Sequence, residues 1–216
     1  MRQSTTIIAV AAVMVVFCAD FPPQLARGQP PVPATTQAAE PAPTVKFVGS
    51  QATGRNVVFI VDATGAMMSQ FDNLRVELRK SIEPLQPSQA FNVVFNQANV
   101  APPISTSLLP ATPNNKQRIY DYIDKCQPRG PTDPDPAIKT ALAMHPDLIF
   151  FLCVPNCIPD PARTTRLFKT LDPAHKCRIN TISFMDETHT NEDMLQQIAK
   201  DSGGEFKHAS EEDLRK

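Results

Sequence analysis

The chain has 216 residues, which is the length of one domain with some chain left over for a leader or a tail. Its 21 basic and 22 acidic residues nearly balance, which excludes the strongly basic surface typical of nucleic-acid-binding proteins. It has 22 prolines against 7 glycines and contains neither glycine-rich phosphate-binding motif, yet 42% of its residues are hydrophobic, enough to bury a core.

The N-terminal segment predicts export. An apolar run without charges extends from Ile7 to Ala19, which suits a secretory signal and is short for a membrane-spanning helix. Small residues for cleavage follow at Ala26–Gly28. We interpret residues 1–28 as a signal peptide, with an uncleaved N-terminal anchor or a lipoprotein modified at Cys18 as alternatives. The mature chain is expected in the periplasm, the cell envelope or the extracellular space, and at a membrane only through an uncleaved anchor.

Residues 29–45 are rich in proline, alanine and threonine and have no apolar period, which is typical of an extended linker. The alternative is a merely disordered tail. The folded domain is then expected over residues 46–216.

From Asn56 onward, short apolar runs alternate with amphipathic segments. The apolar runs predict buried strands at residues 56–62, 91–95, 148–152 and 178–184. The amphipathic segments predict helices at residues 68–82, 114–126, 160–171 and 191–201, and one more helix capped by Asp133. Between them, residues 97–110 predict an irregular excursion, and residues 205–207 a short edge strand. This alternation predicts a doubly wound, mostly parallel α/β sheet with helices on both faces.

In such a sheet a ligand site lies at the carboxyl ends of the central strands. This points to the residues after Val61, the loop around Thr132 and the residues after Leu152. A ligand site in this fold would therefore draw its residues from these three places.

Two of them resemble motifs of von Willebrand factor type A domains. Residues 62–67 (DATGAM) resemble the D-x-S-x-S motif, and residues 130–134 (GPTDP) resemble the second motif, whose threonine completes a metal-ion-dependent adhesion site. Residues 178–184 and 195–204 are similar to the late strand and helix of secreted bacterial members. The resemblance covers about residues 57–214 and implies the Rossmann-like fold of that family.

The resemblance also implies a site for Mg²⁺, Mn²⁺ or Ca²⁺, cations that prefer oxygen ligands. Asp62 and Thr132 match ligands of the family pattern, and Thr64 replaces its first serine but keeps the hydroxyl. Ala66 replaces the second serine and Val154 stands where the third motif has its aspartate, so two of the five ligands are missing. We therefore expect no resident cofactor and at most weak binding of Mg²⁺ or Ca²⁺.

Asp133 follows Thr132 directly and could compensate in part as a metal ligand. The competing interpretation is that it caps the next helix, because aspartate is a preferred N-cap residue. If Asp133 is a ligand, the degenerate site comprises Asp62, Thr64, Thr132 and Asp133.

Four cysteines follow the leader, and an even number in an exported chain favours disulfides. Cys126, Cys153 and Cys157 follow predicted elements at the carboxyl edge, whereas Cys177 begins a strand at the opposite edge. We favour a Cys126–Cys157 bridge, because Cys153 still belongs to a buried strand. The alternative is thiol or zinc chemistry at Cys153 and Cys157, although C-x₃-C without a nearby histidine is a weak zinc pattern.

The sequence shows no catalytic motif, neither G-x-S-x-G nor H-E-x-x-H. The histidines are interpreted as solvated surface residues at positions 145, 175, 189 and 208. Asp186 and Glu187 either form a polar loop or add negative potential at the carboxyl edge.

The sequence thus predicts a non-enzymatic, exported interaction domain that binds a partner protein without a metal. Its binding surface is expected at the carboxyl edge, with the proline-rich loops 98–113 and 155–161 as candidates. One alternative is a thiol- or metal-dependent enzyme or sensor that uses Cys153 and Cys157 near Asp62. Another is a purely structural component of the cell envelope.

Overall fold

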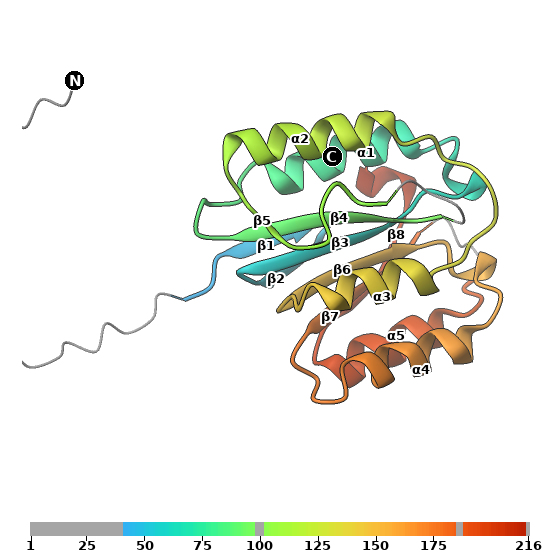
Figure 1. Cartoon of the computed structure of the whole chain (residues 1–216). Coiled ribbons are helices and arrows are strands. Elements are labelled where there is room, and N and C mark those ends of the chain that lie inside the picture. The colour runs from blue at the N-terminus through green and yellow to red at the C-terminus, as the bar shows by residue number, and fades with distance from the viewer. Residues whose placement is uncertain (1–40, 98–101, 185–187, 215–216) are drawn as a thin grey trace, which may run out of the picture. The chain divides into compact units, whose positions relative to one another are not determined.

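The fold is built on a six-stranded sheet in the order β5-β4-β3-β6-β7-β8 (Figure 1). The structure is a computed structural model that describes residues 41–97, 102–184 and 188–214. All neighbouring strands are parallel except the edge pair β4 and β5. The strands of this sheet are β3 (Asn56–Asp62), β4 (Ala90–Asn96), β5 (Leu109–Pro110), β6 (Leu148–Cys153), β7 (Arg178–Phe184) and β8 (Phe206–Ala209). The predicted doubly wound α/β architecture is confirmed.

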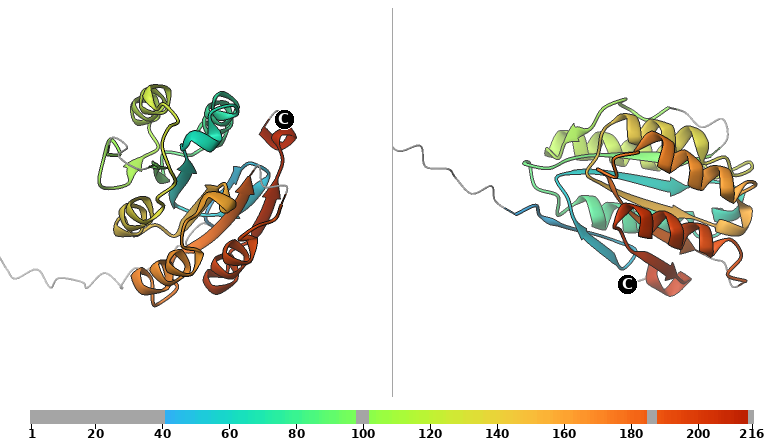
Figure 2. Two further views of the ribbon diagram at one scale, coloured as in Figure 1. Left: turned by 90° about the vertical axis from the view of Figure 1, so that its right-hand side faces the viewer. Right: turned by 90° about the horizontal axis from the view of Figure 1, so that it is seen from below.

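Helices cover both faces of the sheet, which is why its central strands are mostly apolar (Figures 1 and 2). One core cluster lies beneath α1 and α2, and the other beneath α3, α4 and α5. Along β3, Val57, Phe59 and Val61 face the first cluster, whereas Val58 and Ile60 face the second. The helices are α1 (Phe71–Ile82), α2 (Pro113–Lys125), α3 (Asp135–Ala143), α4 (Pro161–Leu171) and α5 (Glu192–Ser202).

A hairpin of β1 (Thr44–Phe47) and β2 (Ser50–Thr53) covers part of the sheet beside α1, and the sequence did not predict it. Its turn has positive φ at both Val48 (45°) and Gly49 (70°), as a two-residue hairpin turn requires. Phe47 is fully buried, and its ring packs edge-on against Phe59 at a centroid distance of 5.3 Å. This packing fixes a segment whose own sequence is too short and too polar to reveal a strand.

The helix boundaries differ from the predicted ones in two informative places. A short 3₁₀ turn, η1 (Gly65–Met67), precedes α1, so the helix begins at Phe71 and not at Met68. The predicted N-cap role of Asp133 is wrong, because α3 begins at Asp135 and Pro134 is its N-cap. Asp133 instead accepts the backbone N–H of Asp135 at 3.3 Å, ahead of the helix.

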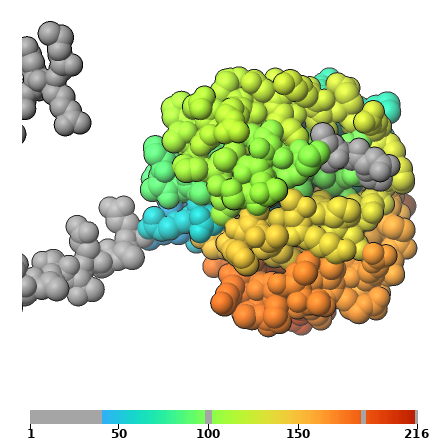
Figure 3. All heavy atoms as spheres, in the orientation of Figure 1, coloured from blue at the N-terminus to red at the C-terminus, as the bar shows by residue number. Residues whose placement is uncertain are grey.

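The segment between β4 and α2 is irregular, as predicted, apart from the two-residue strand β5. Residues 98–101 of its proline-rich loop lie outside the described residues. On the face seen in Figure 3, the green segment before α2, the yellow α3 and the orange α4 form one continuous surface. In the described part of the chain, no helix has the length and apolarity needed to cross a membrane.

Candidate functional site

The three sequence segments predicted to surround a site meet at the carboxyl edge of the sheet. The chain leaves β3 for β4 on one side and later returns to β6 on the other, which makes the end of β3 the topological switch point of the sheet. The Gly65 N–H donates to the Gly130 carbonyl at 3.0 Å, and the Arg129 N–H donates to the Ala63 carbonyl at 3.0 Å. The first loop and the Thr132 loop are therefore joined by backbone hydrogen bonds.

Asp62 lies at the centre of this edge and is fully buried. Its Oδ1 accepts the backbone N–H of Thr64 at 2.9 Å, and its Oδ2 accepts the backbone N–H of Val154 at 3.2 Å. Burial raises the pKa of the Asp62 carboxyl above its ordinary value, and the hydrogen bonds from Thr64 and Val154 oppose this shift only in part. Both oxygens of the carboxylate are thus committed to the loops that follow β3 and β6.

Two buried hydroxyls accompany Asp62. Within the described residues, Thr132 Oγ1 has no hydrogen-bond partner, whereas the buried Thr64 hydroxyl helps to lower the pKa of Asp62. Asn96, the register neighbour of Asp62 on β4, has a buried side-chain amide that also has no partner there. Orphaned polar atoms of this kind suit a bound water or an oxygen-liganded cation.

The complete donor set nevertheless does not fit a tightly bound divalent cation. Asp62 supplies one buried carboxylate at the end of β3, and Ala66 is exposed and has no side-chain oxygen. Val154 is buried and presents its backbone N–H to Asp62 where the family pattern has a second carboxylate. Mg²⁺ and Ca²⁺ depend on such carboxylates to offset the cost of dehydration. Asp133 is exposed and turned toward the start of α3.

The structure does not contain the predicted Cys126–Cys157 bridge. All four cysteines of the described residues are reduced thiols. Cys126 is buried at the end of α2, and burial raises the pKa of its thiol to about 11. Cys157 is exposed in η2 (Pro155–Cys157), the turn after β6. Cys126 is therefore shielded from solvent and Cys157 open to it, although both lie at the carboxyl edge of the sheet.

The thiols of Cys153 and Cys177 are poor nucleophiles in this fold. Cys153 is fully buried, and burial raises its pKa well above the ordinary value, with the nearby charge of Asp62 acting in the same direction. Burial also raises the pKa of Cys177. Because the thiolate is the reactive form, the geometry does not favour the thiol-enzyme alternative.

A pocket of about 340 Å³ opens at the same edge, between the end of β4 and the end of α2. The rings of Phe95 and Tyr122 pack in its wall at a centroid distance of 5.1 Å. Gln97 Nε2 donates to the carbonyl oxygens of Gln127 (3.1 Å) and Arg129 (2.8 Å), which holds the loop that borders the pocket. The exposed side chains of Lys125 and Arg129 complete a lining that is apolar within and basic at its border.

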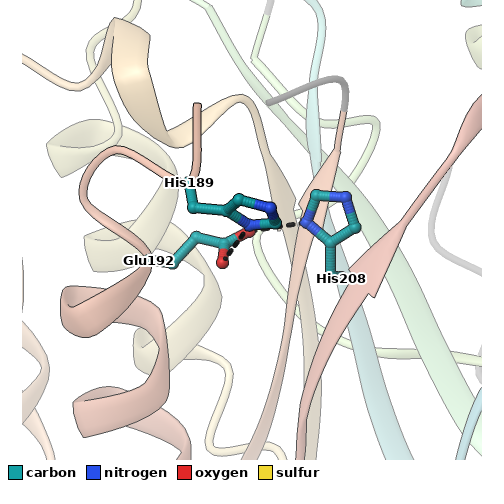
Figure 4. Close-up of side chains that lie close together, drawn as sticks. All are labelled: His189, Glu192 and His208. Atoms are coloured by element: carbon teal, nitrogen blue, oxygen red, sulfur yellow. Dashed lines mark hydrogen bonds and ion pairs between the residues drawn. The ribbon is translucent and has the colours of Figure 1, made fainter. Parts of the chain in front are cut away.

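A second polar cluster lies at the carboxyl ends of β7 and β8, and the sequence analysis missed it. His189 and His208 are exposed, as predicted, but both contact the buried carboxylate of Glu192 (Figure 4). The spacing of His189 and Glu192 at i and i+3 was a readable signal, whereas His208 arrives from a separate strand. Asp186 and Glu187, in the same region of the sequence, lie outside the described residues.

Comparison with solved structures places the fold among von Willebrand factor A domains. The chain is similar to a von Willebrand factor type A protein from Catenulispora acidiphila, with a TM-score of 0.61 and 16% identity over 77% of this chain. It is similar to the pilus adhesin SpaC from Lactobacillus rhamnosus GG, with a TM-score of 0.61 and 12% identity over 76% of this chain. It is also similar to proximal thread matrix protein 1 of the mussel byssus, with a TM-score of 0.56 and 19% identity over 74% of this chain.

The chain spans less than half of each of these structures, namely 42%, 29% and 42% of their lengths. Comparison with curated proteins gave no significant match. The sequence profile of the von Willebrand factor type A domain matches residues 55–207, which include strands β3 to β7 of the main sheet and the start of β8. The chain therefore belongs to the von Willebrand factor type A domain family.

Proposed function

We propose that this chain is an exported, non-enzymatic interaction domain that binds a partner protein through the carboxyl edge of its sheet without a metal ion. The observation that carries this proposal is the double hydrogen bonding of Asp62 by the N–H groups of Thr64 and Val154. In this arrangement backbone donors occupy the carboxylate that would otherwise face a cation. The loops of the edge are held together by the protein itself.

The pocket beside Tyr122 offers the partner a place to dock. Its apolar wall gives area for a buried anchor residue, and Lys125 and Arg129 give two exposed positive charges at the border. Interfaces commonly combine an apolar centre with a charged rim. A segment of the partner with an apolar side chain next to acidic residues fits this lining.

The interaction role is suggested by what the similar structures are, namely a pilus adhesin and a thread matrix protein. These structures establish the shared fold, and the role is part of our proposal. The predicted linker of residues 29–45 is too long at its end, because β1 begins at Thr44. The export signal proposed at residues 1–28 and the shortened linker would present the domain outside the cytoplasm, in the periplasm, the envelope or the extracellular space.

The test is crosslinking and capture of partners from the native envelope, with and without EDTA, followed by mass spectrometry. We expect the captured protein to be the same under both conditions. The variant Lys125→Glu/Arg129→Glu should lose it, because the charge at the border of the pocket is reversed. The matched control Lys176→Glu/Arg178→Glu reverses the same charges at the opposite edge of the sheet, where both side chains are exposed, and should retain it.

Two results would contradict the proposal. Complete loss of the partner in EDTA would show that a cation is required. Equal capture by both charge-reversed variants would show that the partner does not use the pocket at the carboxyl edge. A separate titration with Mg²⁺ or Mn²⁺ should give no micromolar binding that Asp62→Ala abolishes.

A further inference from the structure

We propose that His189, Glu192 and His208 form a binding site for a zinc ion, separate from the cation position that the family pattern places at Asp62. The three residues come from different elements at the carboxyl end of the sheet. Glu192 is the first residue of α5, His189 lies in the loop before it, and His208 lies on β8. The fold, and not the local sequence, brings them together.

The two imidazoles approach the same carboxylate from different sides, as Figure 4 shows. His189 Nδ1 lies 2.9 Å from Glu192 Oε2, and His208 Nδ1 lies 2.6 Å from Glu192 Oε1. The centroids of the imidazole rings are 4.7 Å apart. The potential ligand atoms of the three residues all lie within 4.8 Å of one another.

This spacing requires the distances between ligand atoms to change by at most about 1.4 Å to hold zinc. Zinc–ligand bonds of about 2.1 Å in a tetrahedron place the ligand atoms about 3.4 Å apart. The present hydrogen bonds must therefore lengthen by roughly half an ångström or somewhat more as the ion replaces the shared hydrogens. A neutral histidine can carry its proton on Nε2, which leaves Nδ1 as the ligand.

The carboxylate is fixed while the imidazoles are accessible. The Glu192 side chain is 8% exposed, whereas those of His189 and His208 are 62% and 38% exposed. Helix α5 is anchored to β7, since Thr181 Oγ1 donates to the Leu195 carbonyl at 2.9 Å. Zinc can thus enter from the solvent side and find the Glu192 carboxylate already held in place.

The loop that carries His189 is also constrained. His189 and Asn191 both have positive φ, 55° and 63°, which costs energy for residues other than glycine. Asn191 Nδ2 donates to the Pro155 carbonyl at 3.1 Å, which ties this loop to the turn after β6. The conformation aims the His189 ring at Glu192 and does not leave it to rotate freely in solvent.

The ligand chemistry selects zinc over the hard cations of the family pattern. Two imidazoles and one carboxylate form a ligand set used by zinc sites that keep an open position, whereas Mg²⁺ and Ca²⁺ prefer oxygen ligands alone. Three protein ligands leave a fourth position for water or for a side chain of another molecule. The exposed position of both histidines leaves this fourth position facing solvent.

The test is calorimetric titration of the full chain, without an affinity tag, with ZnCl₂ and in parallel with MgCl₂. We expect saturable binding of one zinc ion per chain, and no binding of Mg²⁺ that depends on these residues. The variant His189→Asn/His208→Asn should bind zinc at least about tenfold more weakly, as expected when ligands of a metal site are removed. Histidine ¹⁵N chemical shifts recorded with and without zinc should change for Nδ1 of both residues.

Matched variants make the result specific. His145→Asn/His175→Asn changes the other two histidines, which are exposed and also have positive φ, and should leave the zinc affinity unchanged. Cys157→Ser, which removes an exposed thiol, should also leave it unchanged. If the double histidine variant fails to fold, Glu192→Gln keeps the size of the side chain, and it should weaken zinc binding by a similar factor.

The proposal is overturned if the wild-type chain shows no saturable zinc binding. It is also overturned if zinc affinity is unchanged in both His189→Asn/His208→Asn and Glu192→Gln, or if it is lost in either matched control alone. In those cases the three residues form a hydrogen-bonded cluster that stabilises the start of α5. The partner-binding proposal is not affected by these outcomes, because its test depends on the pocket beside Tyr122.

Discussion

The backbone N–H of Val154 donates a hydrogen bond to Asp62 Oδ2 at 3.2 Å, and so connects the end of β6 to the end of β3. The family pattern has an aspartate at position 154, and two carboxylates at this edge would need a cation between them. With valine at that position, the Asp62 carboxylate accepts the backbone N–H groups of Thr64 and Val154, which offset the cost of its burial only in part. These hydrogen bonds join the loops that follow β3 and β6 to the same carboxylate.

Burial of Asp62 predicts a particular dependence of stability on pH. Its folded-state pKa lies above the value of 3.8 expected in the unfolded chain, so between these values the folded state binds more protons. The free energy of unfolding should therefore fall as the pH rises toward the folded-state pKa, and this contribution should become constant above it. Asp62→Asn cannot titrate and should lack this decrease.

Urea unfolding of wild type and Asp62→Asn between pH 4 and pH 8 measures the difference. The stability of the wild type relative to the variant should decrease with rising pH. Asp72→Asn, at an exposed position on α1, serves as the control and should follow the wild-type curve closely. Parallel curves for wild type and Asp62→Asn would contradict the prediction.

Asp147→Ala should lower the free energy of unfolding by about 2 kcal/mol, because two half-buried backbone donors lose their acceptor. The Asp147 carboxylate accepts the N–H of Arg55 at 3.1 Å and that of Asn56 at 3.0 Å, and so connects the starts of β6 and β3. Asp121→Ala, on the exposed side of α2, should change stability by less than about 0.5 kcal/mol. Chemical denaturation of the two variants gives the comparison, and equal effects would refute it.

Alanine substitutions at the neighbouring Gly203 and Gly204 should lower the stability of the protein by different amounts. A Cβ on Gly204 would lie 2.0 Å from the Ile179 carbonyl oxygen, so Gly204→Ala must displace β7 from α5 and should cost about 3 kcal/mol. A Cβ on Gly203 meets no described atom within 4 Å, so Gly203→Ala should cost only the strain of its φ of 71°, about 1–2 kcal/mol. Thermal denaturation should rank the two variants in this order, and the reverse order would show that the approach of α5 to β7 is looser than described.

Cysteine reactivity should follow burial. Cys157 is exposed and should react with iodoacetamide in the folded protein, whereas the buried thiols of Cys126, Cys153 and Cys177 should react only after unfolding. Peptide mass spectrometry after timed alkylation separates the four sites. Rapid labelling of Cys153 would favour the thiol-dependent alternative, and a Cys126–Cys157 peptide under non-reducing conditions would show a bridge that the structure lacks.

The local pattern of the sequence predicted the main sheet well. Strands β3 and β7 have the predicted bounds, and β4 and β6 extend the predicted runs by a residue or two. Burial on both faces favours apolar residues at most positions, and this preference is visible in a few consecutive residues. The loss of side-chain oxygens at Ala66 and Val154 could also be read directly, because it depends on residue identity alone.

The sequence by itself thus determined the fold class and the composition of the Asp62 site. Only the tertiary structure decided which groups donate hydrogen bonds to Asp62, how the β1–β2 hairpin packs, and that His208 contacts Glu192. These are contacts between segments that the sheet register brings together. A contact of this kind leaves no periodicity in the sequence, because the register and packing of separate elements determine it and not the preferences of neighbouring residues.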